Sequence, residues 1–393
     1  MADRLGEIAL GFLKVGATAY GGPAIMGVMQ AEFQDRRQWV SRSRFVEGLS
    51  LANMLPGATA TQLGIFLGYS RGGVWGGVIA GLCFVAPGLL VMLALTLAYA
   101  ALGVSPLVRG ALYGLGPVVL AIFIVAVHRL GTATVRSAQH GLIALAAAAG
   151  AVLSPLGLPA ILLLAGGAGL LLFHSRRLGA VVLVLLGVGL ALLHLTAGAP
   201  MPPPAASSAA VSAPRPWDVI ALFLTVGAFT FGGGLSMVAL MQEQIVTQLH
   251  WLTPQEFIDG LALGQLTPGP VLIVAAYVGY KVLGVAGAVL AAAAIFLPSF
   301  VLMVAALPVF DRVRTLAWAR AAMQGIGPGV IGVLAVSLAR LLPHAAPDSL
   351  AAVVLVLTVA ALAAWRVAPL KLMLAGAVVG AARSRLTVVA GLR

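Results

Sequence analysis

Charged residues are scarce in this sequence. Only 9% of its 393 residues are Asp, Glu, Lys or Arg, while 61% are hydrophobic and the mean hydropathy is +1.08. A soluble domain would carry about 25% charged residues. The apolar stretches run roughly 14 to 28 residues, near the ~20 that a helix needs to cross a bilayer, and they lack the alternation of an outer-membrane barrel. The composition therefore predicts an all-α polytopic membrane protein.

Cysteine and histidine are too few, or too scattered, to build a site. The single cysteine, Cys83, excludes an intramolecular disulfide, and the six histidines show no metal-ligand spacing. There is no P-loop motif, so ATP would not drive this chain by itself. The apolar segments also lack the paired carboxylates of a membrane-embedded enzyme. We therefore expect a protein that is not an enzyme, needs no cofactor or metal, and draws its energy from a gradient.

Negative charge is the scarcer sign, and the net charge is +12 from 23 Lys+Arg against 11 Asp+Glu. Most of these charges lie in short loops between apolar segments. Lys and Arg in such loops set the orientation in the membrane and contact anionic lipid, so we expect lipid rather than nucleic acid as the partner. The excess of cations would also attract anions toward a pore mouth.

The chain divides into two membrane parts. Apolar segments lie at about 8–29, 48–69, 74–101 and 110–128, followed by a short pair at about 140–153 and 159–174 and a further run near 178–196. Residues 198–216, rich in Pro, Ala and Ser, have the composition of a linker. We predict an N-terminal membrane repeat at 1–197 that includes an extra crossing near 178–196, a linker at 198–216, and a C-terminal membrane repeat at 217–393.

The second part repeats the first. Gly22 and Gly233 are 211 positions apart, and so are Arg129 and Arg340. Between them a one-residue slip, placed after Glu32 and Glu243, aligns Pro56-Gly57 with Pro268-Gly269, and it closes again by Gly68-Tyr69 and Gly279-Tyr280. The shared residues are mostly helix breakers, which chance alone does not explain.

An inverted arrangement of the two repeats is expected. The run near 178–196 has no counterpart in the second part, and an extra crossing would turn the second repeat over. The loop after the first segment carries Arg36, Arg37, Arg42 and Arg44, whereas its counterpart carries Glu243, Glu256 and Asp259 and no cation. The positive-inside rule would place these loops on opposite sides. Arg176-Arg177 and Arg312/Arg314 do not fit this scheme.

Two sets of helix breakers interrupt the apolar segments. Gly21-Gly22-Pro23 lies within 8–29 and recurs as Gly232-Gly233-Gly234. Gly costs about 1 kcal/mol and Pro about 3 kcal/mol in a helix interior. A broken helix persists in hydrocarbon only where protein or a wet cavity covers it. The clusters predict broken helices at the midplane, which in transporters point half-helix ends at the substrate.

The second set places amides beside Pro-Gly pairs. Pro56-Gly57 and Pro268-Gly269 force the preceding residues out of the α region. The helix that restarts beyond each break presents unpaired N–H groups to an anion. Glycine-packed kinks, with the amides bonding neighbouring helices, are the alternative. The predicted substrate-binding residues are Lys14, Gly21, Gly22, Pro23, Asn53, Pro56, Gly57, Thr59, Gln62, Gly232, Gly233, Gly234, Gln265, Thr267, Pro268, Gly269 and Pro270.

Charged residues near the breaks have two interpretations each. Lys14 lies within the first apolar segment, where a cation is costly and usually functional, although its stem could also reach the interface. Glu32 and Glu243 stand at matched places and are candidates for proton coupling or for surface ion pairs. Arg129 and Arg340, at the matched ends of a segment, are candidates for an anion gate or for interfacial anchors.

These motifs resemble those of the chromate ion transporter family in its long two-domain form. The matching stretches are Phe12 to Gly16 followed by Gly21-Gly22-Pro23, Asn53 to Gln62, Thr230 to Gly234, Ala262 to Pro270, and Ile295 to Phe300. The resemblance implies two homologous domains of opposite orientation and a carrier that exports chromate with the proton motive force. The family's Pro-Gly-Pro is Pro56-Gly57-Ala58 here, and Tyr20 replaces its usual Phe, so we expect a softer break in the first half.

We therefore expect a secondary transporter in the cytoplasmic (inner) membrane of a bacterium. Its predicted substrate is chromate, with sulfate, another tetrahedral dianion, as the second candidate. Protons, membrane lipid and a second copy of the chain in a homodimer are the expected partners. A carrier for another inorganic or organic anion, and an anion channel, are the alternative functions.

Overall fold

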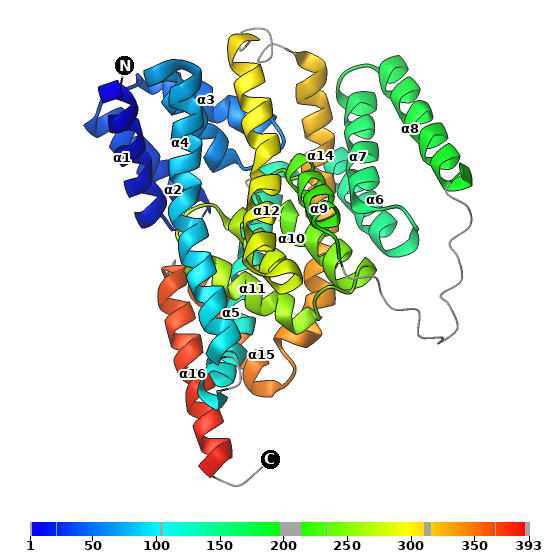
Figure 1. Ribbon diagram of the computed structural model, residues 1–393. Coiled ribbons are helices and arrows are strands. Elements are labelled where there is room, and N and C mark those ends of the chain that lie inside the picture. The colour runs from blue at the N-terminus through cyan, green and yellow to red at the C-terminus, as the bar shows by residue number, and fades with distance from the viewer. Residues whose placement is uncertain are drawn as a thin grey trace.

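The computed structural model describes residues 2–20, 22–102, 105–196, 214–232, 234–309, 316–365 and 367–389. Within these ranges every regular element is helical (Figure 1). Four helical stretches are long and apolar enough to cross a membrane: Thr59–Leu102 (α4), Pro106–Thr134 (α5), Val271–Val309 and Ala317–Ala345 (α14). The stretch Val271–Val309 is made of η3 (Val271–Ile273), α12 (Val274–Ala306) and η4 (Leu307–Val309). The predicted all-α membrane fold is confirmed.

The first apolar segment is a helical hairpin. The helix α1 (Ala2–Thr18) is followed by α2 (Gly22–Met29) and the π-helix η1 (Gln30–Arg36). Phe12 stacks on Phe33 with ring centroids 4.3 Å apart, and Trp39 Nε1 donates to Glu7 Oε1 at 3.1 Å. These contacts require the chain to reverse after Thr18. The expectation that 8–29 runs on across the bilayer as one interrupted helix is therefore wrong.

The segment 48–69 is a second hairpin. The helix α3 (Arg42–Met54) folds back on the first turns of α4, and a Cβ at Gly48 would overlap the ring of Phe66. α4 then reverses again at Gly72 and Gly73, where φ at Gly73 is +65°. A Cβ at Gly68 would overlap the carbonyl oxygen of Gly76, so the two arms of this turn lie in direct contact. Only the second arm, 74–102, has the length of a spanning helix.

The second repeat has the same backbone. Its helices are α9 (Pro216–Ala228), α10 (Ser236–Met241), the π-helix η2 (Gln242–Gln248), α11 (Pro254–Leu266) and then η3 and α12. Unusual conformations recur in register: Gln38 and His250 have φ of 53° and 51°, and Gly73 and Gly284 have φ of 65° and 64°. Such matched exceptions support the duplication more strongly than shared helices would, because positive φ is uncommon outside glycine.

The hydrogen bonds of the π-helices correct one detail of the alignment. Arg37 N donates to Glu32 O, and Leu249 N donates to Gln244 O, which makes Gln244 the counterpart of Glu32. The one-residue slip therefore lies earlier, in the Gly-rich turn before α10, and Glu243 corresponds to Ala31. A turn accepts an extra residue more easily than a helix does, since one residue rotates every later side chain by about 100°.

The repeats run in opposite directions. In Figure 1, α4 descends from the turn beside α1 to the lower edge, whereas α12 ascends to the upper edge. The two helices pack together where a Cβ at Gly81 would overlap the ring of Phe300. The predicted inverted arrangement agrees with these directions.

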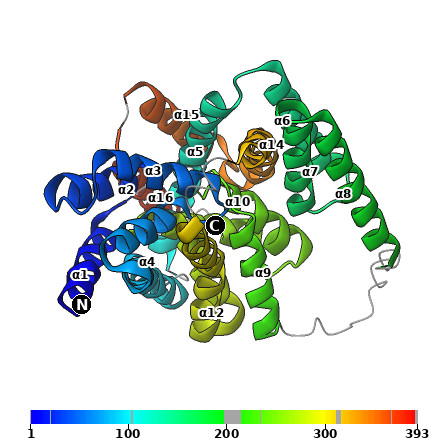
Figure 2. The ribbon, with the colours of Figure 1, turned by 90° about the horizontal axis from the view of Figure 1, so that it is seen from above.

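The last helices of each repeat pack on the other repeat, so the two repeats exchange their terminal helices. After α5 come α6 (Ala138–Leu153) and α7 (Leu158–Phe173), and these pack on α14 of the other repeat. Likewise α15 (Ser349–Ala364) and α16 (Pro369–Val389) pack on α5, and Figure 2 shows both groupings from above. Glycine pairs allow this contact: a Cβ at Gly114 would overlap Gly376 O, and one at Gly325 would overlap Ala165 O. Small residues at such crossings are typical of membrane helices.

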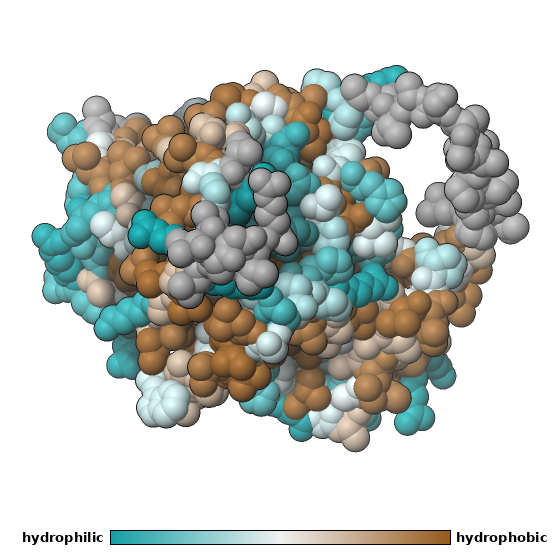
Figure 3. Space-filling view, turned by 90° about the horizontal axis from the view of Figure 1, so that it is seen from below, coloured by the Kyte–Doolittle hydropathy of each residue, from teal (hydrophilic) through white to brown (hydrophobic). Residues whose placement is uncertain are grey.

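The predicted extra crossing coincides with one helix, α8 (Arg176–Thr196), which packs on α7. Its passage through the membrane stays a prediction, as do the boundaries 1–197, 198–216 and 217–393. Residues 197–213, most of the predicted linker, lie outside the described residues. Apolar groups occupy much of the rim of the lower face (Figure 3), as contact with lipid requires.

The glycine contacts between α5 and α16 predict the effect of a larger side chain. Gly114→Leu should lower the stability by about 1–3 kcal/mol or more, because the added atoms would force the two backbones apart. Thermal unfolding of the purified protein in detergent measures this. The matched control is Gly187→Leu on α8, where a Cβ would meet nothing within 4 Å. Equal melting temperatures for the two variants would contradict the packing described here.

Candidate functional site

The turns of the four hairpins meet at the centre of the molecule. Gly57 N donates to Thr230 O at 2.7 Å, and Gly269 N donates to Ala19 O at 2.8 Å. The two bonds are equivalent under the repeat, since each joins a Pro-Gly turn of one half to the Gly-rich turn of the other half. Because the repeats are inverted, a contact on the axis that relates them lies at mid-depth. The predicted breaks are thus brought together.

Glycine is required at both Pro-Gly turns. Gly57 has φ of +125° and Gly269 has φ of +91°, a region that side chains rarely adopt. A Cβ at Gly57 would also overlap Ser299 Oγ and lie 2.9 Å from Gln62 Nε2. Gly232 and Gly234 have φ of +66° and +96°. Gly21 and Gly233 lie outside the described residues, while Gly22 and Pro23 begin α2, where the side chain of Pro23 is not described.

Ala58 does not soften the first break. α3 ends at Met54 and α4 begins at Thr59, so the interruption is complete. Unlike proline, Ala58 carries an N–H, and this group donates to Ser299 Oγ at 2.8 Å. In the other half Pro270 has no N–H, and glycine, Gly88, stands at the position that matches Ser299. The two halves therefore use different residue pairs at these turns, Ala58 with Ser299 in one and Pro270 with Gly88 in the other. The expectation of a softer break in the first half is wrong.

Polar side chains gather on the first-half side. Thr59, Thr61 and Gln62 are buried in the first turn of α4, and Gln62 Nε2 donates to Pro56 O at 2.7 Å. Thr61 Oγ1 and Gln62 Oε1 have no hydrogen-bond partner within the described ranges. The matching stretch of the second half, 271–274, is apolar. Unsatisfied buried groups at a helix N-terminus favour a bound polar species there.

The predicted amides differ in their surroundings. Asn53 is exposed on the last turn of α3, whereas Gln265 is half-buried. Thr267 is buried, and its hydroxyl donates to Leu263 O at 2.8 Å. Pro268 O lies close to Gly88, where a Cβ would approach it to 2.7 Å. All of these positions border the central turns, and their predicted role in binding stays a prediction.

Lys14 and Glu32 form one ionic cluster. Lys14 Nζ lies 3.2 Å from Glu32 Oε2, Arg36 Nη1 lies 3.1 Å from the same oxygen, and Arg37 Nε lies 2.8 Å from Glu32 Oε1. Burial alone would raise the pKa of Glu32, but the hydrogen bonds from Arg37, Lys14 and Arg36 lower it to about 2. Glu32 therefore keeps its charge at neutral pH, which favours the ion-pair interpretation over proton coupling.

Glu243 has weaker partners. It is half-buried, its carboxylate accepts from Gln248 Nε2 at 3.0 Å, and burial raises its pKa against the charge of Arg340. It therefore loses its charge more easily than Glu32 does. Its predicted role in proton coupling stays a prediction.

Arg129 and Arg340 each bind the C-terminal end of a helix that packs on the other repeat. Arg129 Nη2 donates to Leu362 O at 3.0 Å, and Arg340 Nη2 donates to Ala151 O at 2.9 Å. Each carbonyl lies in the last turn of a helix that came from the other repeat. A cation at a helix C-terminus is stabilising, so the geometry favours anchoring. The gating role stays a prediction.

A buried carboxylate was missed by the sequence reasoning. Asp259 on α11 is 7% exposed, and its oxygens accept from Tyr99 Oη at 3.1 Å and from Gln255 Nε2 at 3.2 Å. Burial raises its pKa to about 6 despite these two hydrogen bonds. The available signal was an acidic residue directly before the apolar run Gly260–Gly264 that leads to Gln265.

The comparisons with known proteins agree with this architecture. A family model described as Chromate transporter matches residues 6–172 and 217–381. The chain belongs to the chromate transporter family. The two matched ranges follow the two repeats, and the family consists of transporters rather than enzymes. Within the described ranges no group of His, Cys, Asp and Glu could hold a metal ion.

Several relatives extend along most of the chain. A chromate transport protein of Cupriavidus metallidurans is 30% identical over 381 residues, which cover 95% of this chain and 91% of that protein. A "Probable chromate transport protein" of Synechococcus elongatus is 34% identical and covers 79% of this chain and 78% of its own length. A chromate transport protein of Pseudomonas aeruginosa is 33% identical, with 82% and 77% covered. No solved structure matches the chain.

The two Pro-Gly turns differ in whether the residue after glycine carries a backbone N–H that needs an acceptor. This difference predicts that two substitutions compensate each other. Ser299→Gly should cost about 1–3 kcal/mol, because it leaves the Ala58 N–H buried without a partner. Ala58→Pro alone should also destabilise, since the proline ring would collide with Ser299 Oγ. The double variant should recover most of the loss, because it copies the Pro270 and Gly88 pair of the other half. Melting temperatures in detergent measure this, and additive losses would refute the explanation.

Proposed function

We propose that this protein is a secondary transporter that exports chromate across the cytoplasmic membrane of a bacterium, driven by the proton motive force. Sulfate is the second substrate candidate, because it is also a tetrahedral dianion. The family supports chromate transport. The observation that carries the proposed mechanism is the meeting of the four turns at mid-depth, with the start of α4 among them.

The start of α4 is the proposed anion site. A helix N-terminus offers unpaired N–H groups and a partial positive charge, which suit an oxyanion without a basic side chain. The buried hydroxyl of Thr61 can add a donor, since it has no partner within the described ranges. The Pro-Gly turns and Gln265 from the other half would close the site from the opposite side.

Lys14 would bring the anion toward the turns. It lies one to two helical turns from Ala19, the residue whose carbonyl accepts from Gly269. Its side chain is 52% exposed although it pairs with Glu32, so the ammonium keeps contact with the surroundings. Arg36 and Arg37 surround the same carboxylate, and the cluster is positive overall. A funnel of cations concentrates anions at its mouth.

The orientation follows from the basic edge. Arg36, Arg37 and Arg71 lie near the start of α1, where Glu7 pairs with Arg37 and Arg71. The turn between α7 and α8, next to Arg176 and Arg177, lies at the same upper edge (Figure 1). These two arginines therefore fit the scheme they seemed to contradict, while Arg312 and Arg314 lie outside the described residues. We assign this edge to the cytoplasm by the positive-inside rule.

A transport assay in inverted membrane vesicles tests the function directly. Uptake of labelled chromate should saturate, should be inhibited by excess sulfate if both anions share the site, and should collapse with an uncoupler. Flux that neither saturates nor responds to the uncoupler would indicate an anion channel instead. Absence of chromate uptake with intact uptake of another anion would indicate a different substrate.

Thr61→Val should lower chromate uptake roughly 10- to 100-fold at low substrate concentration, because a hydrogen bond to a charged group is worth about 1.5–3 kcal/mol. The same change should leave thermal stability equal or higher, since it removes a buried hydroxyl without a partner. The matched control is Thr96→Val, farther along α4, whose hydroxyl donates within the helix to Met92 O. Wild-type uptake by Thr61→Val would exclude the hydroxyl from the site.

Lys14→Ala and Gln265→Ala should each lower chromate export while membrane insertion stays intact. Lys14 should act mainly on substrate capture, so its variant should show a higher KM and a weaker dependence on ionic strength. Gln265 should affect KM and the maximal rate together, because it borders the central Pro268-Gly269 turn. Initial rates at several chromate and salt concentrations separate the two effects. Wild-type kinetics in both variants would defeat the proposed path.

A further inference from the structure

We propose that Asp259 is the proton-carrying group of the transport cycle, loaded from the face of the membrane opposite to Lys14. This inference rests on the proposed function, since it names the site at which the driving proton binds. Asp259 and Glu32 are the only acidic residues that are fully buried within the described ranges. Their surroundings differ in a way that decides which of them can change its charge.

Glu32 has cationic partners and Asp259 has neutral ones. Three cations lie within 3.2 Å of Glu32. The donors to Asp259 are the phenol of Tyr99 and the amide of Gln255. A buried carboxylate without an ion pair accepts a proton readily, because the charged form loses its hydration and gains little in return.

The charged residues near Asp259 are paired with each other. Lys281 on α12 is the cation that faces this region, and its Nζ lies 2.7 Å from Glu256 Oε1. Glu256 also accepts from the backbone of Thr253, as the cap of α11. Of the other elements around α11, α4 contributes Tyr99, and α12 contributes Tyr277 besides Lys281. On the side of α5 and α14 the contact is apolar, since Ile258 and Leu261 line one small cavity with Gly116, Leu338 and Leu341.

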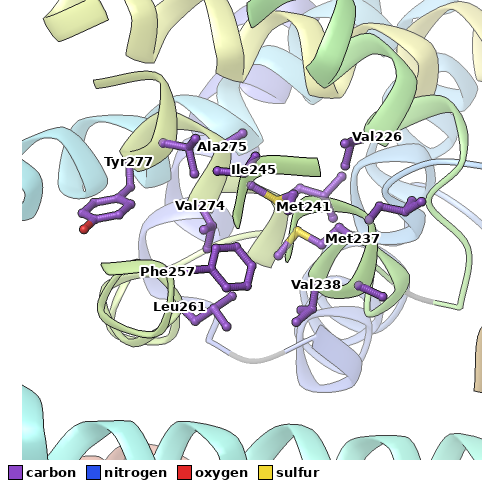
Figure 4. Close-up of a cluster of buried hydrophobic side chains, with 14 of the residues drawn as sticks. Val226, Met237, Val238, Met241, Ile245, Phe257, Leu261, Val274, Ala275 and Tyr277 are labelled. Carbon is purple, nitrogen blue, oxygen red and sulfur yellow. The ribbon is translucent and has the colours of Figure 1, made fainter. Parts of the chain in front are cut away.

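The buried hydroxyl of Tyr277 also lacks a hydrogen-bond partner among the described residues of this region. It is fully buried, its ring meets the ring of Tyr99 edge-on at 5.8 Å, and its hydroxyl has no hydrogen-bond partner within the described ranges. Figure 4 shows this hydroxyl directed away from the apolar cluster around Phe257 and Val274. A water molecule beside the Tyr99 ring would satisfy this hydroxyl. Tyr99 and Tyr277 thus form a polar pair beside the carboxylate.

The geometry connects the proton to the substrate. Gln255, one turn from Asp259 on α11, is exposed, and Tyr99 is half-exposed, so water reaches the carboxylate from this side. From Asp259 the helix α11 continues to Leu266, about 10 Å along its axis, and the Pro-Gly turn with Gly269 follows. The last turn of α11 leads directly into the central contact with Ala19. One short helix therefore carries the carboxylate near its middle and leads, at its C-terminal end, into the turn that makes half of the central contact.

In the proposed cycle, a proton from the outer water binds a carboxylate oxygen of Asp259 and neutralises it. No other bond forms or breaks. The neutral group holds the hydroxyl of Tyr99 less strongly, which loosens the contact of α11 with α4 and releases the turn that follows α11. The proton leaves to the cytoplasm in the alternate conformation, while the anion leaves in the opposite direction.

Vesicles with the full-length protein test this with two measurements: chromate uptake driven by a pH gradient, and exchange of labelled for unlabelled chromate at equal pH. Asp259→Asn should lower the driven uptake at least tenfold and keep exchange within about twofold, because exchange needs no net proton movement. Asp259→Glu should restore the response to the gradient. The matched control is Glu47→Gln, at the position in the first repeat that corresponds to Asp259 and is paired with Arg44.

The outcomes separate the proposals. Driven uptake by Asp259→Asn equal to that of the wild type, or loss of the pH response in Glu243→Gln but not in Asp259→Asn, overturns the assignment. Wild-type exchange without any response to a pH gradient overturns the proton coupling but leaves transport standing. Absence of both activities in the wild type overturns the proposed function itself.

Tyr99→Phe decides the case in which Asp259→Asn loses both activities. Removing a donor to the carboxylate raises its pKa. The midpoint of the pH dependence of driven uptake should therefore move upward by about half a unit or more. An unchanged midpoint would overturn the assignment. Tyr69→Phe, a tyrosine of the first repeat, serves as its control.

Discussion

Two backbone hydrogen bonds at mid-depth hold the architecture together. A chain that turns inside a membrane exposes peptide groups where water is scarce, and each unpaired group costs several kcal/mol. Here the Pro-Gly turn of each half gives its N–H to the Gly-rich turn of the other half. Neither half can satisfy its own turns in this way. The inverted pairing of the repeats thus follows from a requirement of the backbone as much as from side-chain packing.

The same requirement explains one matched difference between the halves. An N–H at Ala58 needs an acceptor, and Ser299 supplies one, whereas Pro270 needs none, and Gly88 stands at the position that matches Ser299. The polar residues that follow, Thr61 and Gln62, occur in one half alone. A symmetric scaffold therefore carries an asymmetric site, which suits a carrier whose substrate and driving ion use different groups.

Much of this could be predicted from the sequence. The low charge fixed the fold class, and the recurring glycines and prolines revealed the duplication and the positions of the breaks. The direction of the chain after each break could not be predicted, because an apolar run of 22 residues fits one crossing or two half-length helices equally well. Phe33 over Phe12 decides between them, and that contact depends on the complete fold. The burial of Asp259 was likewise hidden, since its partner Tyr99 lies 160 positions earlier in the chain.

The exchanged helices have a consequence for synthesis. When α5 enters the membrane, the helix that will cover its glycines Gly110 and Gly114, α16, has not yet been translated. Gly110 and Gly114 must face lipid or a temporary neighbour until the C-terminal helices arrive. Assembly of the first half therefore waits for α16, and a ribosome that stops after α14 leaves α5 with an uncovered glycine face.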